Sequence, residues 1–449
     1  MFPWRIDYKE CSLIFLGLIW LGFSLVAYSW HETFFFWNQI RLAPSYALSL
    51  GAPLYGHLDK DPLVWHLYGP FAPIFYYPAI LVSHPLTALV LGICMSWGIM
   101  LIAFWSCLRV WGASISKTVG ILLFIFALAF HFRIAWDLFR IMADLPAVGF
   151  AFLALALAWR GKSFWCGFFL LLSLASKQTM FPMVLFVCWM LFYKKGTLRE
   201  MLYGIGIAGL PLLIGLGLTD QLQTMVDSTI LLPLSHPWKN FDSGESHFHT
   251  YLSQLIGPQS WLLLGFILSR IGAQPFIRTK EIQWIRFCSV LGIVFYCVGA
   301  LQSCKIGGTT NAFFPSLMIF YSLLPMWALW FCESTKERFS LVKKIGSGLA
   351  ILFLGIIAVQ SLLLINELKT MTPHPASLAY QNCIEHPKRT YEIHLPLSQM
   401  MAEKRVYHIG DVLQNCDLGR TPVPEENQKR WLPEGTELMN LRYWKEPTK

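Results

Sequence analysis

The stretch "DLPAVGFAFLALALAWRGKSFWCGFFLLLSLASKQTMF", residues 144–181, decides the class of fold. It holds two apolar runs, Leu145–Trp159 and Phe164–Ala175, separated by the basic tetrapeptide "WRGK". Repeated apolar runs are the signature of helices that cross a lipid bilayer. Short runs are tolerated where the helices line a polar cavity. The stretch therefore predicts a helical hairpin within a membrane protein.

The same pattern extends over most of the 449 residues. Hydrophobic residues make up 55% of the chain and charged residues only 14%, whereas a soluble protein carries roughly a quarter charged residues. Further apolar runs are Ser12–Trp30, Val119–Phe132, Met180–Phe192, Met201–Leu218, Ser260–Leu268, Phe287–Ser303, Ala312–Phe331 and Leu349–Leu364. We therefore expect an all-α polytopic membrane protein with about 11–13 transmembrane helices.

The loops between these runs alternate in charge. One set, which includes "WRGK" and "YKKGTLRE", holds 17 Lys and Arg residues, and the opposite set holds 7 outside the C-terminal segment. The positive-inside rule places the first set in the cytoplasm. Most unpaired carboxylates and special glycines lie in the opposite set. The groups that could carry chemistry and the C-terminus are therefore predicted to face the non-cytoplasmic side, which for an inner membrane is the periplasm.

The chain divides into a transmembrane domain, residues 1–367, and an extracytoplasmic C-terminal domain, residues 368–449. The transmembrane domain carries a long first outer loop, residues 31–70, and another outer loop, residues 219–250. In the C-terminal domain, "TYEIHLPL" is typical of a strand, and "SQMMAEKRVYHI" of a helix or a second strand. We expect a small α/β segment there.

A proline-rich stretch, "PFAPIFYYPAILVSHP", follows the first outer loop. The alternation of loop charge requires an odd number of crossings between residues 71 and 108, although hydropathy favours two. The four prolines favour a helix that rests in the outer leaflet or is half-inserted. One full crossing is then expected before residue 108.

Glu32 closes the first apolar run, in "SWHETFFFWNQIRLA", residues 29–43. It is either the polar stop of a helix or a catalytic carboxylate. The amphipathic stretch of residues 34–50 that follows would lie along the membrane surface. The first outer loop is also far longer than usual, and such loops are commonly functional. These features favour the catalytic interpretation.

Arg140 and Asp144 form a second charged group, in "FRIMADLPA". Residues four apart can pair on one face of a helix. Asp144 is also typical of a helix N-cap with Pro146 in the first turn. The cap does not explain why Arg133 and Asp137 crowd the same outer turn. We therefore treat Asp144 as a candidate catalytic residue.

Two lysines lie next to apolar runs. Lys177 either snorkels to the interface or faces a polar cavity and holds an anion. Lys305 begins "KIGGTTN", in which Gly307 and Gly308 allow close approach of backbone amides and Asn311 follows at a helix start. Such a start favours anions. The alternatives are a phosphate site and a flexible turn.

No cofactor is required by the sequence. A divalent cation could bind His247 and His249 with Asp242 and Glu245, but this spacing is a weak metal signal. A lid over the site is the favoured interpretation of this loop. No basic, aromatic-interleaved module for nucleic acid is found in the sequence, so no nucleic-acid partner is expected.

Acids and lysines on one membrane face suit a reaction between a lipid-borne phosphate and a hydroxyl. A general base takes the proton of the acceptor, while cations hold the leaving phosphate. The alternative is a transporter or flippase of an amphipathic lipid or lipid-linked sugar, for which inverted repeats are typical. No internal repeat is found in the sequence. A non-catalytic scaffold would not need both lysines beside outer acids.

The motifs in this order resemble the GT-C superfamily of integral-membrane glycosyltransferases. The resemblance covers roughly residues 12–320 and is greatest to the bacterial branch related to protein mannosyltransferases and lipid A aminoarabinose transferase. It rests on "HETFFFWNQ", "YALSLGAPLY", "YGPFAPIFYYP", "RIMADLPAVGF", "SKQTMF" and "KIGGTTNAFFP".

The resemblance implies a polyprenyl-phosphate-linked sugar donor and a lipid, glycan or protein acceptor of the cell envelope, with membrane lipids as further partners. Glu32 would be the catalytic base, and Asp59 or Asp61 is the alternative because the family commonly has Asp. Asp144 would be the second catalytic residue. The donor would be bound by Tyr55, Asp59, Asp61, Tyr68, Arg140, Lys177, Gln178, Lys305, Gly307, Gly308 and Asn311.

Overall fold

The computed structural model of the chain describes residues 33, 35–65, 67–110, 140–193, 196–239, 246–272, 280–306, 310–320, 323, 374–388, 391–392 and 394–432. These residues are mostly helical. The β-type pairing found within them is an isolated antiparallel bridge between Trp238 and Lys305. The all-α prediction is confirmed for this part of the chain.

Three described helices are long and apolar enough to cross a membrane. They are α4 (Pro85–Val110), α10 (Leu198–Leu218) and α15 (Lys280–Ser303). A fourth span forms if α13 (His247–Leu255) and α14 (Ser260–Gly272) are counted together across their 65° bend. Several predicted runs lie outside the described residues, so the full number of about 11–13 helices stays a prediction.

The proline-rich stretch before α4 forms two short helices, α3 (Phe71–Tyr76) and η1 (Tyr77–Leu81). Pro78 lies in the first turn of η1, where its fixed φ is favourable and no amide donor is needed. A single long helix follows, which agrees with one crossing before residue 108.

The centre of the bundle is α7 (Asp144–Trp159), in which every residue except Leu157 and Trp159 is buried. An apolar helix with no polar face is expected to be surrounded on all sides. The helices α8 (Ser163–Ser176) and α9 (Pro182–Tyr193) pack against it, and η2 (Gln178–Met180) joins them. These helices are shorter than a full span, as the sequence predicts.

The crossing of α8 and α10 depends on two glycines. A Cβ atom on Gly167 would lie 2.0 Å from the carbonyl oxygen of Met201, and one on Gly204 would lie 2.0 Å from that of Phe164. Small residues let membrane helices approach backbone to backbone. This contact fixes α10 on the outside of the α7–α8 hairpin.

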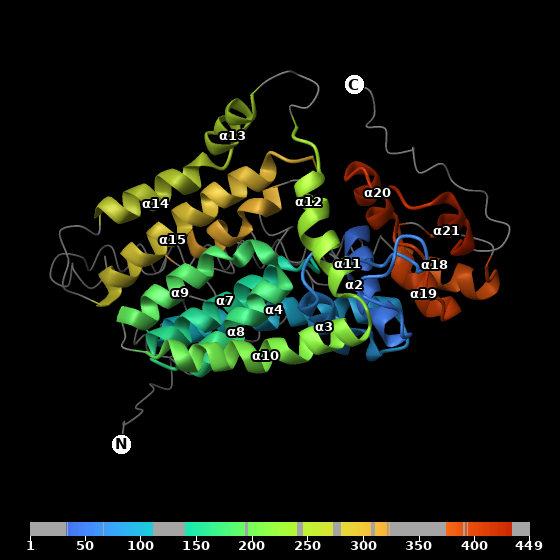
Figure 1. Cartoon of the computed structure of the whole chain (residues 1–449), viewed down its shortest axis with the longest axis horizontal. Coiled ribbons are helices and arrows are strands. Elements are labelled where there is room, and N and C mark those ends of the chain that lie inside the picture. The colour runs from blue at the N-terminus through green and yellow to red at the C-terminus, as the bar shows by residue number, and fades with distance from the viewer. Residues whose placement is uncertain are drawn as a thin grey trace, which may run out of the picture.

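The short helices and the C-terminal helices gather at one end of the bundle, at the right in Figure 1. We call this the capped end. It contains α2 (Phe36–Ser49), α3, η1, α11 (Leu222–Val226), η3 (Asp227–Leu231), α12 (Leu232–Ser235), α18 (Pro375–Glu385), α19 (Pro396–Glu403), α20 (Gly410–Leu418) and α21 (Glu425–Arg430).

The opposite end of the bundle, at the left in Figure 1, is where α9 and α14 finish and where α10 and α15 begin. We call it the basic end, for Arg160, Lys162, Arg199, Arg270 and Arg286. These residues belong to the loops that the charge count assigns to the cytoplasm. The orientation of the chain in the membrane stays a prediction from that count.

The described C-terminal residues form four helices and do not form the predicted α/β segment. The expected strand in "TYEIHLPL" is interrupted because Pro396 starts α19, a position that proline favours. Residues 405–409 are not helical, and the amide of Ile409 donates to the carbonyl of Leu63 at 2.9 Å. The extended segment after α19 therefore contacts the first outer loop.

Candidate functional site

A buried ion pair joins two of the predicted site residues at the capped end. The Lys177 ammonium donates a hydrogen bond to Asp144 Oδ1 at 2.5 Å. The Lys177 side chain is 5% exposed and that of Asp144 is fully buried. Such a pair overcomes its desolvation cost only with good geometry. Of the two interpretations of Lys177, this burial argues against snorkelling to the interface.

The local backbone explains why these two residues meet. Asp144 is the first residue of α7, and Ala143 is the N-cap, with no side-chain capping bond. Lys177 follows the last residue of α8 in an extended conformation, with φ of −150° and ψ of 117°. Since α7 and α8 are antiparallel, the start of one lies beside the end of the other. The prediction that Asp144 is an N-cap is wrong.

Arg140 was expected to share one helical face with Asp144, and this is wrong because α7 begins only at Asp144. The Arg140 guanidinium lies over the ring of Phe35, 3.7 Å from its centroid. Cations this close to an aromatic face are attracted to it. Arg140 therefore belongs to the capped end, next to the N-terminal side of α2.

Tyr68 brings a second cation to the ion pair. The Lys177 Nζ atom lies 5.0 Å from the centroid of the Tyr68 ring, and the Arg41 Cζ atom lies 5.8 Å from it. Both distances are within the range of cation–π attraction. The ring of Tyr68 thus contacts both cations, Lys177 and Arg41.

Two side chains, Tyr55 and Gln178, hold the backbone around Tyr68. The hydroxyl of Tyr55 donates to the Tyr68 carbonyl at 2.8 Å. Burial raises the pKa of Tyr55, so this phenol stays protonated and keeps donating. The Gln178 amide donates to the carbonyl of Thr229 at 2.6 Å and more weakly to that of Leu67 at 3.3 Å. The predicted residues Tyr55, Tyr68 and Gln178 therefore lie in one continuous arrangement.

Gly69 fixes this segment against the end of α8. Its amide donates to the carbonyl of Ser176 at 3.2 Å. A Cβ atom at this position would lie 2.1 Å from the carbonyl oxygen of Ala175. Only glycine permits so close an approach. The "YGP" sequence is therefore required by the packing of the first outer loop on the bundle.

Several buried polar atoms near the pair have no hydrogen-bond partner within the described part of the chain. They are Arg41 Nη1, Asp144 Oδ2 and Gln178 Oε1. Unsatisfied buried polar groups are uncommon, and each costs about 1–3 kcal/mol. One of these atoms donates and two accept, and they belong to α2, α7 and the turn after α8. Only the Arg41 guanidinium among them could donate to an anion, because the other two atoms are acceptors.

Helix α2 was predicted to lie along the membrane surface, and this stays a prediction; the structure shows that its polar residues are buried within protein. The Gln39 side-chain oxygen accepts hydrogen bonds from the amide and the hydroxyl of Ser398, each at 3.0 Å. The Asn38 side-chain oxygen accepts from the amide of Ile141 at 2.7 Å. One polar side of α2 therefore contacts the C-terminal helices, and another contacts the start of α7.

Asp411, at the start of α20, adds a carboxyl group that the sequence did not single out. Burial raises the pKa of Asp411 to about 6, and the charge of Arg41 together with a bond from Asn415 opposes that rise. Arg41 is likewise attracted electrostatically to Asp411 and Asp144. The C-terminal helices thus supply part of the electrostatic environment of Arg41.

The C-terminal segment also holds the first outer loop. The His408 ring accepts from the amide of Leu63 at 2.8 Å through Nδ1, and its Nε2 lies 3.1 Å from the Asn427 carbonyl oxygen. Asn427 in turn donates to the carbonyls of Leu58 and Asp61 at 2.6 and 3.2 Å. Because a carbonyl only accepts, Nε2 carries the proton and His408 is neutral.

Asp59 and Asp61 lie in this same loop. Arg430 donates to the backbone carbonyls of Asp59 and Lys60 at 2.9 and 2.8 Å. The Asp59 side chain is exposed, and Asp61 Oδ2 accepts from the amide of His57 at 3.0 Å. Asp61 therefore shapes the loop by closing a turn.

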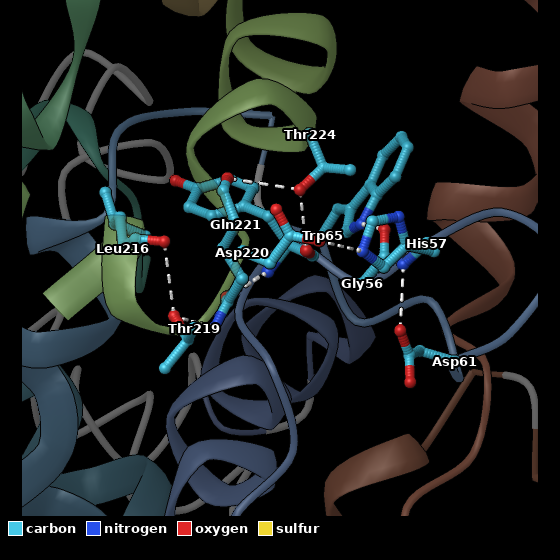
Figure 2. A network of polar contacts seen from close by, with 10 residues as sticks. Gly56, His57, Asp61, Trp65, Leu216, Thr219, Asp220, Gln221 and Thr224 are labelled. Atoms are coloured by element: carbon cyan, nitrogen blue, oxygen red, sulfur yellow. Dashed lines mark hydrogen bonds and ion pairs between the residues drawn. The ribbon is translucent and has the colours of Figure 1, made fainter.

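The turn after α10 holds the other side of the first outer loop, as Figure 2 shows. The Tyr55 amide donates to Gln221 Oε1 at 2.9 Å, and the Thr224 hydroxyl donates to the Tyr55 carbonyl at 2.8 Å. The His57 ring lies 3.7 Å from the exposed carboxylate of Asp220. These bonds attach the loop to the bundle independently of the C-terminal helices.

Lys305 makes contacts that the sequence did not indicate. Its ammonium donates to the carbonyls of Leu234 and His236 at 2.9 and 2.8 Å, and it lies 5.3 Å from the ring centroid of Trp238. The end of α15 is thereby attached to the segment after α12. Gly307 and Gly308 lie outside the described residues, and Asn311 lies in η5 (Thr310–Phe313).

The histidines considered for a metal lie on α13. The His247 ring stacks on Trp238, with centroids 4.4 Å apart, and the Ser246 hydroxyl caps the helix. In the part of the chain that the structure describes, no group of three or more His, Cys, Asp or Glu side chains is placed to hold a metal ion. Asp242 and Glu245 lie outside that part.

Glu32 also lies outside the described residues. Thr33, the next residue, has its hydroxyl 2.7 Å from His374 Nε2, at the start of α18. Phe35 contacts Arg140, and Phe36 contacts the ring of His394. The chain immediately after Glu32 is therefore part of the capped end.

Arg41 and Asp411 are the two site residues that sequence reasoning missed. Arg41 was one charge within an amphipathic stretch, and Asp411 was one of several acids in a polar segment. A single cation within a largely apolar run was the available signal for Arg41. No signal in the sequence indicated Asp411, because Asp411 belongs to the site only through its electrostatic interaction with Arg41 of α2, near the other end of the chain.

Comparison with known proteins gives no relative: no family model, no curated protein and no solved structure matches this chain.

Proposed function

We propose that this chain is a membrane glycosyltransferase that moves a sugar from a polyprenyl-phosphate donor to an acceptor at the capped end. The observation that carries the proposal is the buried Asp144–Lys177 pair beside Tyr68 and Arg41. In this arrangement two cations, Lys177 and Arg41, lie next to the ring of Tyr68. A buried cationic group at the end of an apolar bundle suits a phosphate attached to a long hydrocarbon chain.

Arg41 and Lys177 are the residues that would hold the donor phosphate. The unpartnered Arg41 Nη1 is a donor suited to a phosphate oxygen, since guanidinium groups bind phosphate through several donors at once. Asp144 orients the ammonium of Lys177 and keeps it charged in a buried position. In this role Asp144 is a positioning residue, because its carboxylate is fully buried and already paired.

The reaction needs a base that the Asp144 carboxylate does not supply while it is paired. Glu32 is the proposed base: its carboxylate takes the proton of the acceptor hydroxyl as that oxygen bonds to the anomeric carbon. The bond between the anomeric carbon and the phosphate oxygen breaks at the same time. Polyprenyl phosphate leaves, and Arg41 and Lys177 stabilise the negative charge that develops on it.

The first test measures binding of polyprenyl phosphate to the purified protein by native mass spectrometry, with uncharged polyprenol as the comparison lipid. We expect a preference for the phosphate of at least about tenfold, since charge-assisted bonds contribute about 1.5–3 kcal/mol each. Arg41→Gln should remove most of that preference. Arg160→Gln is the matched control, because Arg160 is exposed at the basic end.

The second test follows release of polyprenyl phosphate from a polyprenyl-phosphate-linked sugar in membranes that contain the protein. Glu32→Gln should retain binding and lose turnover. Binding without any release by the wild-type protein would instead indicate a lipid transporter. Equal binding of polyprenyl phosphate and polyprenol would remove Arg41 and Lys177 as a phosphate site.

A further inference from the structure

A pocket of about 310 Å³ is lined by residues of the basic end. In Figure 1 this end of the bundle lies opposite the capped end. The pocket lies where α7 and α9 end, α14 ends and α15 begins. Its lining includes four aromatic rings and two guanidinium groups, from Trp159, Trp189, Tyr193, Phe287, Arg270 and Arg286. The pocket therefore combines an apolar, aromatic wall with positive charge.

The aromatic residues place this pocket at the boundary between hydrocarbon and headgroups. Trp189 and Tyr193 are each 54% exposed, and Trp189 stacks on Phe287 with ring centroids 5.0 Å apart. Tryptophan and tyrosine concentrate at the level of lipid headgroups because one part of each ring system is apolar and the other is polar. The last turns of α7 and α9 therefore mark one membrane interface.

Two arginines, Arg270 and Arg286, bring positive charge to the pocket. Arg270 lies in the last turn of α14, where the helix dipole favours a cation. Arg286 lies in the second turn of α15, where the dipole gives a cation no such stabilisation. No carboxylate is among the described residues that line the pocket. Two guanidinium groups in one pocket suit a phosphodiester, whose oxygens accept several hydrogen bonds.

We infer that this pocket binds an anionic phospholipid, with the phosphodiester on Arg270 and Arg286 and the first carbons of the acyl chains against Trp189 and Phe287. Basic pockets between membrane helices on the cytoplasmic side bind anionic headgroups in this way. The volume suits a headgroup and a short length of chain.

The part of each lipid acyl chain that extends beyond the pocket can contact an apolar protein surface. The exposed apolar side chains of α9 and α14 include Leu185, Leu264 and Ile267. An acyl chain that leaves the pocket along these helices stays in contact with apolar groups. The inference is independent of the proposed glycosyltransferase activity, because it involves other residues at the other end of the bundle.

The test is native mass spectrometry of the full-length protein after delipidation and addition of phosphatidylglycerol or phosphatidylcholine of the same acyl chains. We expect a preference for phosphatidylglycerol of at least about fivefold, because its headgroup is a net anion whereas choline compensates the phosphate charge. The preference should decrease as ionic strength rises. Equal retention of the two lipids would overturn the inference.

Variants assign the preference to this pocket. Arg270→Met with Arg286→Met should abolish the preference, whereas Arg160→Met with Arg199→Met, which removes two exposed cations from the same end, should retain it. If the first double variant does not purify as a single species, Arg270→Lys with Arg286→Lys replaces it. This second pair should reduce the preference, because lysine lacks the planar fork.

Two further outcomes would contradict the assignment. Loss of the preference in the control pair alone would place the site elsewhere on the basic end. Displacement of phosphatidylglycerol by millimolar inorganic phosphate would indicate a simple anion site and overturn the lipid assignment.

Discussion

The capped end holds a buried cation, Lys177, whereas the cations that define the basic end are exposed or half-buried. At the capped end, Lys177 is buried against Asp144, and Lys305 donates to two carbonyls. At the basic end, Arg160 and Arg199 are exposed. The sequence alone does not distinguish a buried cation from an exposed one. A buried cation destabilises the fold unless it is paired, whereas an exposed cation needs no partner. The difference shows that charge is buried at a cost in stability where the start of α7 meets the end of α8.

The largest expected effect of a single substitution is that of Lys177→Met at the capped end. Removing one partner of a buried ion pair leaves an uncompensated charge and costs about 3–5 kcal/mol. The free energy of unfolding, measured in mixed detergent micelles, should decrease by that amount. Asp144→Asn combined with Lys177→Met should recover part of the loss. A double variant no more stable than Lys177→Met would show that the pair is not the source of the effect.

Gly69→Ala should have the next largest effect. The added Cβ atom would lie 2.1 Å from the carbonyl oxygen of Ala175, so the first outer loop must move away from α8. Overpacking of this kind costs about 1–3 kcal/mol. Gly98→Ala is the matched control, because a Cβ atom on Gly98 in α4 would meet nothing within 4 Å. Equal melting temperatures for the two variants would show that the loop is not held there.

A pH dependence should follow from His408 at the capped end. Burial lowers the pKa of His408 to about 4, whereas an unfolded histidine titrates near about 6.5. Between these values the unfolded chain binds the extra proton, so the contribution of His408 to stability falls as the pH falls below about 6.5, by about 1.4 kcal/mol per pH unit at most. His408→Gln keeps an acceptor and a donor and should flatten the decline.

The control for this measurement is His374, whose pKa burial also lowers to about 4. It is unchanged in His408→Gln, so part of the decline should remain in that variant. The free energy of unfolding is compared at several pH values between about 4 and 7.5. Identical pH profiles for the variant and the wild type would contradict the role of His408.

The smallest effect is expected at the basic end. Arg199→Met removes an exposed guanidinium whose Nε donates to the Tyr203 hydroxyl at 3.0 Å. Exposed side chains of this kind change the free energy of unfolding by less than about 0.5 kcal/mol. A loss comparable with that of Lys177→Met, measured in the same micelles, would contradict the contrast between the two ends.

Much of the helical framework could be predicted from the sequence. The runs Leu145–Trp159, Phe164–Ala175 and Met201–Leu218 correspond closely to α7, α8 and α10. Composition over a local window determines such runs, because each apolar segment must avoid water whatever its neighbours are. The predicted α/β segment is wrong for the described residues because Pro396 and the residues after it start a helix.

The candidate site could be predicted only in part. Asp144, Lys177, Tyr68 and Gln178 were each singled out, but the expected partner of Asp144 was Arg140. A spacing of four residues indicates a contact only within a helix, and α7 starts too late for that. The contact between α2 and the C-terminal helices was not predicted, because Ser398, which bonds to Gln39, lies 359 residues away in the chain.

The sequence by itself determined that the chain is mostly helical, which of its segments are apolar, and which loops are basic. These properties depend on the free energy of moving local segments between water and lipid, so local composition is sufficient. Only the tertiary structure decided that Lys177 pairs with Asp144, that Arg41 faces Tyr68, and that His408 holds the first outer loop. Those contacts join residues far apart in the chain, and their strength comes from burial that no single segment provides.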